Sequence, residues 1–124
     1  MQEIPKSLKR VITVLEKCAG VKVKVNTPEE WKEHTSMVRR YGSELWNRLY
    51  YSGFAFYSPA LKEINITPYT SPSTLIHEFG HYLEAETEEE ATRRGEGEYR
   101  RLLRDPVCRS ILEVFAPEVL KEEE

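Results

Sequence analysis

One short motif, His77-Glu78-Phe79-Gly80-His81, constrains the fold of this 124-residue chain more than any other feature. Two histidines four positions apart lie on one face of a helix, one turn above the other, so both imidazoles can reach a single zinc ion. A glutamate beside the first histidine is then placed to act as a general base. The motif therefore predicts a helix that carries a metal site, and a second segment that returns to complete it.

The residues around the motif favour a packed helix. Ser71-Pro72 is a capped, proline-led helix start. The apolar residues of the predicted helix are Leu75, Ile76, Phe79 and Leu83. We predict that His77 and His81 bind Zn²⁺ and that Glu78 takes a proton from water, which is chemistry suited to peptide hydrolysis. The alternatives are a degenerate metal site and two histidines that only pack.

Around the motif the chain resembles the zincin metallopeptidases. The resemblance is carried by Phe54-Ala55-Phe56-Tyr57, Ile64-Asn65-Ile66 and the segment from Thr74 to Leu83, and it covers about residues 53–95. Its one highly specific element is H-E-x-x-H. The resemblance implies a zinc-dependent peptidase of the endopeptidase type, whose active helix follows an edge strand. In that arrangement Ile64-Asn65-Ile66 would align an extended peptide by strand addition.

The third metal ligand is expected after the motif, because zinc peptidases supply three protein ligands and keep a fourth position for water. Metzincins use a downstream histidine and this chain has none, so the gluzincin class is favoured, with a glutamate on a following helix. The segment 88–95 resembles that helix in thermolysin-like, ImmA/IrrE-like and minimal archaeal gluzincins, and Glu88 matches the ligand. At 100° per residue Glu88 shares a face with Ala91 and Gly95.

Three features of this segment leave alternatives for the third ligand. Thr92 stands where the family often has an acidic residue that supports a ligating histidine, so we expect that support to come from elsewhere. The gap from His81 to Glu88 is short, and it requires a helix break near residues 85–87. A second weak point lies at Gly95 and Gly97. The other candidate ligands are Glu98, Glu84, Glu90, Glu96 and Glu113.

The remaining patterns predict a small α+β domain, and the resemblance implies that it is zincin-like. We expect a short mixed or antiparallel sheet with a backing helix, the motif helix and a C-terminal glutamate helix. The further predicted helices span 6–18, 28–50 with a possible kink at Gly42-Ser43, and 107–120 interrupted at Pro117. The predicted strands span 21–25, 53–57 and 61–66, the last two as a hairpin. Residues 1–120 should form one domain, followed by a frayed acidic tail at 121–124.

Composition narrows the expected partners. With 31% charged residues of mixed sign and a net charge of -3, the chain lacks the concentrated positive face that nucleic acids require. It contains no run of about 18 apolar residues and no signal-like N-terminus. We therefore expect a cytoplasmic location and no association with a membrane. The expected partner is a peptide or protein substrate, bound by a monomer or small homo-oligomer.

The two cysteines, Cys18 and Cys108, lie 90 positions apart without the close pairing of a zinc or redox motif. Buried free thiols are the favoured reading. The possibility of a disulfide stays open. The chain has few Asn and Gln and many charged residues, as proteins of hyperthermophiles do, and such proteins can contain intracellular disulfides.

Other roles are expected for three further side chains, and other functions are considered for the protein. His34 should be a partly exposed or packing histidine, and Tyr82 and Tyr99 are conceivable transition-state donors that more often pack. A non-catalytic interaction or regulatory protein with a structural zinc site is the alternative function. A third hypothesis is latency, with the segment 111–124 occupying the cleft.

Overall fold

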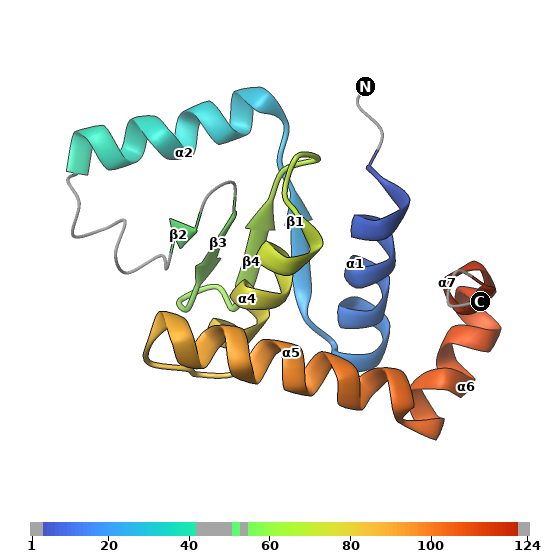
Figure 1. Cartoon of the computed structure of the whole chain (residues 1–124). Coiled ribbons are helices and arrows are strands. Elements are labelled where there is room, and N and C mark those ends of the chain that lie inside the picture. Colours follow the sequence, from blue (N-terminus) through green and yellow to red (C-terminus); the bar gives the residue numbers. More distant parts are fainter. Residues whose placement is uncertain (1–3, 42–50, 53–54, 122–124) are drawn as a thin grey trace.

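The computed structural model describes residues 4–41, 51–52 and 55–121, with side chains described over 4–34 and 55–121 (Figure 1). Its strands are β1 (Lys22–Val25), β2 (Tyr51–Ser52), β3 (Ala55–Ser58) and β4 (Glu63–Ile66). Its helices are α1 (Lys6–Ala19), α2 (Pro28–Tyr41), α4 (Pro72–Tyr82), α5 (Glu88–Arg104), α6 (Pro106–Phe115) and α7 (Pro117–Lys121). The protein is therefore α+β, as the sequence patterns predict.

The sheet has the order β1-β4-β3-β2, with β4 inside it. The predicted hairpin forms, since β3 and β4 are antiparallel with Tyr57 opposite Ile64. On the other side β1 runs parallel to β4 with Val23 opposite Ile64. The prediction that Ile64-Asn65-Ile66 forms an edge strand is wrong, because both edges of β4 are already paired. A parallel partner from far upstream is a nonlocal feature that local alternation does not reveal.

The two faces of the sheet differ in chemistry because successive side chains point to opposite sides of a strand. Ile64 and Ile66 join the apolar core with α1 and α4. Asn65 and its cross-strand neighbour Phe56 occupy the other face, where Trp31 at the start of α2 packs on Phe56 with ring centroids 5.7 Å apart. Fully buried apolar side chains of the core include Leu8, Val14, Leu15, Ile64, Ile66, Leu75, Phe79 and Leu112. The core thus lies between the sheet and the helices α1, α4, α5 and α6.

A disulfide joins α1 to α6 through Cys18 and Cys108. The preference for free thiols is therefore wrong. Each cysteine lies on the apolar face of its amphipathic helix, and packing of α6 on α1 brings their Cα atoms to 5.2 Å, within the range that a disulfide spans. Pairing of this kind depends on helix packing, which the spacing of two cysteines does not give.

Most predicted helix boundaries are confirmed by their caps. Thr27 and Glu30 form the reciprocal capping box at the start of α2, and the break at Pro117 separates α6 from α7. The predicted weak point at Gly95 and Gly97 is wrong, since α5 runs unbroken through both.

Some predictions fall wholly or partly outside the described residues. The second half of the predicted helix 28–50, its kink at Gly42-Ser43, and the first residues of the predicted strand 53–57 lie there. Of the predicted tail 121–124, Lys121 belongs to α7 and the rest lies outside. Within the part of the chain that the structure describes, no helix combines the length and the apolar character needed to cross a membrane.

Candidate metal centre

The motif lies on α4, which begins as its sequence predicts. The Ser71 hydroxyl accepts a hydrogen bond from the Thr74 N–H, and Pro72 occupies the first turn. The helix packs against β3, β4 and α5. This packing buries two polar members of the motif almost completely, with Glu78 0% and His81 3% exposed. Such burial requires a compensating role, because an unpaired polar group in the interior costs free energy.

A tight turn brings the chain back from α4 to α5. The Glu84 N–H donates to the His81 carbonyl and the Ala85 N–H to the Gly80 carbonyl, which is the Schellman pattern. Glu84 itself adopts a left-handed backbone, with φ of 69°, where glycine is usual. The Thr87 hydroxyl then caps α5 by accepting the Glu90 N–H. This turn confirms the predicted break near residues 85–87 and explains how a short gap without glycine suffices.

Two glycines let α4 and α5 approach unusually closely. A Cβ at Gly80 would lie 1.8 Å from the Ala91 carbonyl oxygen, and one at Gly95 would lie 2.0 Å from the Ile76 carbonyl oxygen. No side chain fits at either position without moving a backbone. The helix face that carries Ala91 and Gly95 thus faces the motif helix, as the 100° spacing predicts, and Glu88 begins the same helix.

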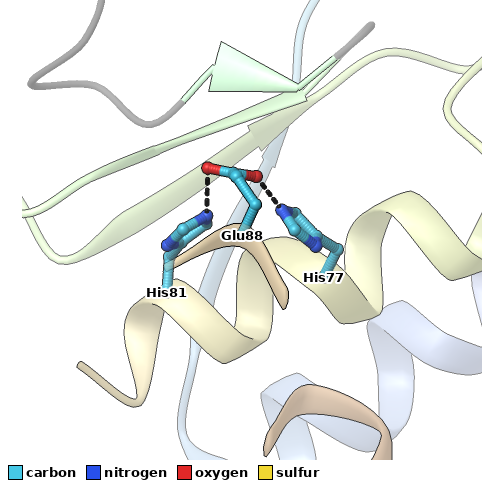
Figure 2. Close-up of side chains that lie close together, drawn as sticks. All are labelled: His77, His81 and Glu88. Atoms are coloured by element: carbon cyan, nitrogen blue, oxygen red, sulfur yellow. Dashed lines mark hydrogen bonds and ion pairs between the residues drawn. The ribbon is translucent and has the colours of Figure 1, made fainter. Parts of the chain in front are cut away.

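Figure 2 shows the result, in which Glu88 reaches over both motif histidines from the first turn of α5. One carboxylate oxygen lies 2.5 Å from His77 Nε2 and the other 3.2 Å from His81 Nε2. The three ligand-type atoms lie within 4.8 Å of one another. Over the described residues no other group of His, Cys, Asp and Glu side chains converges in this way. The structure therefore brings together the three residues named as metal ligands.

The alternative third ligands lie elsewhere. Three of them form ion pairs along the exposed surface of α5, with the following partners: Glu90 with Arg94, Glu96 with Arg100, and Glu98 with Arg101. Glu84 and Glu113 are exposed and belong to no converging group.

The converging atoms fit the demands of a tetrahedral zinc ion. Zinc bonds to histidine nitrogen and carboxylate oxygen are roughly 2.0–2.2 Å long, which places ligand atoms about 3.4 Å apart. The two separations between Glu88 oxygens and histidine nitrogens, 2.5 and 3.2 Å, are somewhat shorter than that value, and all three ligand-type atoms lie within 4.8 Å of one another. Glu88 remains 67% exposed, while the side chains of His77 and His81 are 13% and 1% exposed. A site built this way is closed on the protein side and open on the other.

Glu78 is a buried carboxyl group beside this cluster. Neither of its oxygens has a hydrogen-bond partner of normal geometry among the described residues. Burial first and the Glu88 carboxylate second raise the pKa of Glu78 from 4.5 to about 9, and the Tyr57 backbone N–H opposes the rise. The influence of Glu88 places the two carboxyl groups within electrostatic reach of each other. Glu78 therefore carries a proton at neutral pH whenever no cation lies nearby.

His81 is held in the form that can donate a lone pair. Burial lowers the pKa of its imidazole, and this outweighs the opposing effect of the Glu88 carboxylate. A neutral imidazole at pH 7 is the form that ligates metal ions.

Thr92 is a contact of the site that sequence reasoning missed. Its hydroxyl lies 2.8 Å from His77 Nδ1, so the expectation that support for the histidine comes from elsewhere is wrong. The signal was present, since Thr92 follows Glu88 by four positions and therefore lies on the same face of α5.

The other singled-out side chains have packing roles. His34 bonds the Asn26 side chain at 3.3 Å and packs on Phe56, as expected. Tyr82 packs on Tyr57 and Phe79, and Tyr99 borders the core.

The C-terminal helices do not cover the cluster. Figure 1 shows α6 and α7 at the C-terminal end of α5, whereas Glu88 lies at its N-terminal end. Residues 111–121 therefore do not occupy the site in this structure, and the latency hypothesis for 111–124 stays a prediction.

Comparisons of the chain with known protein families, with curated proteins and with solved structures find no match.

Proposed function

We propose that the protein is a zinc-dependent peptidase in which His77, His81 and Glu88 hold the metal and Glu78 is the general base. The observation that carries this proposal is the convergence of the three ligand atoms next to a fully buried, unpartnered carboxyl group. Structural zinc sites use four protein ligands, whereas catalytic sites use three and keep one open position. The exposure of Glu88 supports the open, catalytic kind.

The chemistry assigns separate work to the metal and to the chain. Bound zinc would polarise the scissile carbonyl and lower the pKa of water to about 7. Glu78 accepts the proton of the attacking water and delivers it to the leaving amine. Its buried position keeps bulk water from competing for that proton. Gly80 contributes to the site indirectly. Its missing side chain lets α5 approach α4 at Ala91, and this close approach brings Glu88 near the two histidines.

A peptide substrate would reach the site from the β2 side of the sheet. The inner strand β4 has no free edge, and the described outer strands are β1 and β2. The backbone of Tyr57 in β3 lies near Glu78, since its N–H affects the pKa of that carboxyl group. β2 flanks β3, so strand addition on that side would bring an extended peptide towards the general base.

The decisive test is the Glu78→Gln variant. It should bind zinc as the wild type does, yet lose cleavage of an unstructured protein substrate, because an amide cannot accept the proton. Glu113→Gln, which changes an exposed glutamate on α6, is the matched control and should cleave normally. Cleavage by Glu78→Gln at the wild-type rate would remove Glu78 from the mechanism.

Thermal denaturation with and without a chelator tests the alternative structural role of the metal. Strong destabilisation by the chelator, with no turnover of any unstructured substrate by the zinc-loaded wild type, would favour a non-catalytic zinc protein.

A further inference from the structure

The second ring nitrogen of His77, Nδ1, has a hydrogen-bond partner on α5. His77 Nδ1 lies 2.8 Å from the Thr92 hydroxyl, and that hydroxyl lies 3.3 Å from the Glu88 carbonyl oxygen. A carbonyl only accepts hydrogen bonds, and a hydroxyl has one hydrogen to donate. When Thr92 donates to the Glu88 carbonyl, its lone pair is left to accept the N–H from His77 Nδ1.

From this geometry we infer that Thr92 is a positioning residue, which holds the proton of His77 on Nδ1 and so leaves the Nε2 lone pair free for the metal. The inference rests on the proposed metal site. Metal-bound histidines usually donate their second N–H to an acceptor that orients the ring. Here the acceptor is a neutral hydroxyl on the same helix as the third ligand.

The arrangement links two ligands through one side chain. Thr92 contacts the ring of His77 and the backbone of Glu88 at once, so a displacement of α5 moves both metal-binding groups together. The side chain of His77 is 13% exposed and that of Glu88 is 67% exposed. These two ligands are therefore the ones least restrained by burial, and they need an orienting contact more than His81 does.

Zinc affinity measured by competition with a chromophoric chelator tests the inference without any assay of cleavage. Thr92→Val keeps the shape and removes the hydroxyl, and it should weaken zinc binding roughly 10–100-fold, the usual effect of losing such a partner. Thr92→Ser keeps the hydroxyl and should retain the wild-type affinity. Wild-type zinc affinity in Thr92→Val would overturn the inference.

Thr13→Val is the matched control. The Thr13 hydroxyl makes the same bond to a carbonyl four residues earlier in a helix, with the Lys9 carbonyl 2.8 Å away. It lies on α1, and this hydrogen bond involves no histidine, so zinc affinity should be unchanged. An equal loss in Thr13→Val would assign the effect to helix stability and overturn the inference.

A second measurement needs no metal and separates this inference from the proposed function. In metal-free Glu88→Ala, which removes the carboxylate next to Nε2, long-range ¹H–¹⁵N NMR should place the His77 proton on Nδ1. Adding Thr92→Val should remove that preference. A proton found on Nε2 in Glu88→Ala would overturn the role of Thr92, even in a protein that cleaves peptides. The expected tautomer in a protein without zinc affinity would instead count against the proposed function alone.

Discussion

The molecule contains two clusters of polar side chains that differ in how their hydrogen bonds are completed. On the α2 side of the sheet, His34 donates to Asn26, Asn26 to Asn65 and Asn65 to Glu63, whose other oxygen pairs with Lys22. Donors and acceptors alternate along this sheet-face chain. At the α4–α5 crossing, by contrast, two imidazole nitrogens and two carboxylate oxygens point at one another.

The contrast separates a structural histidine from a candidate ligand. The sheet-face chain is complete by itself, because each polar atom named in it has a partner of opposite kind. The crossing cluster collects groups that act as acceptors when the imidazoles are neutral, beside the unpartnered Glu78. Only protons or a cation satisfy such a set. This contrast, rather than the motif alone, supports a metal at His77 and His81 and none at His34.

Substitution of single histidines should show the largest difference between the two clusters. His81→Ala removes a ligand, so zinc affinity should fall by more than the roughly 10–100-fold that loss of an outer partner costs. His34→Ala, in the sheet-face chain, should leave zinc affinity unchanged. Isothermal titration of both variants with zinc measures the difference, and an equal loss in both would erase the distinction between the clusters.

The glycine contact tests why the acceptors converge. Gly95→Ala forces a methyl group onto the Ile76 carbonyl, and we expect a loss of about 1–3 kcal/mol in the free energy of unfolding together with weaker zinc binding. Gly97→Ala, two positions on, meets open space and should stabilise the helix by about 0.5–1 kcal/mol. Urea denaturation of the two variants gives both values. Equal stabilities would mean that helix spacing does not set the geometry.

The stability of the metal-free protein should also depend on pH through Glu78. Its pKa is raised from 4.5 to about 9 by burial first and by the Glu88 carboxylate second. The folded protein therefore retains a proton that the unfolded chain loses. This stabilisation is present below pH 4.5 and declines as pH rises towards 9, with a slope of at most about 1.4 kcal/mol per pH unit.

Urea denaturation in chelator between pH 6 and 8.5 checks this dependence. Glu78→Gln has no proton to lose there and should show a flatter profile than Glu113→Gln. Identical slopes in the two variants would assign the pH dependence to other groups.

Much of the site was predictable because its determinants are local. Two histidines one turn apart, the Ser71 cap and the 100° spacing that selects Glu88 all act within a few residues along the chain. The position of the break between α4 and α5 was predictable for the same reason, although Glu84 takes the left-handed conformation that glycine normally supplies.

The features that sequence patterns missed depend on contacts between distant segments. β1 pairs with β4 across about 40 residues and removes the edge expected at Ile64-Asn65-Ile66. Thr92 departs from the acidic residue of the family pattern, but its hydroxyl can also accept a hydrogen bond from His77. Gly95 was predicted to be a weak point of the helix. Instead, α4 and α5 can approach closely because Gly95 has no side chain.

The bond between Cys18 and Cys108 closes a covalent ring that contains both polar clusters. A peptidase that cut its own backbone between these positions would stay one molecule, with its fragments tied through sulfur. On a non-reducing gel such a nicked protein would migrate near the intact chain, and only a reductant would separate the pieces. Self-processing of this protein should therefore be examined with and without reductant before the chain is considered uncut.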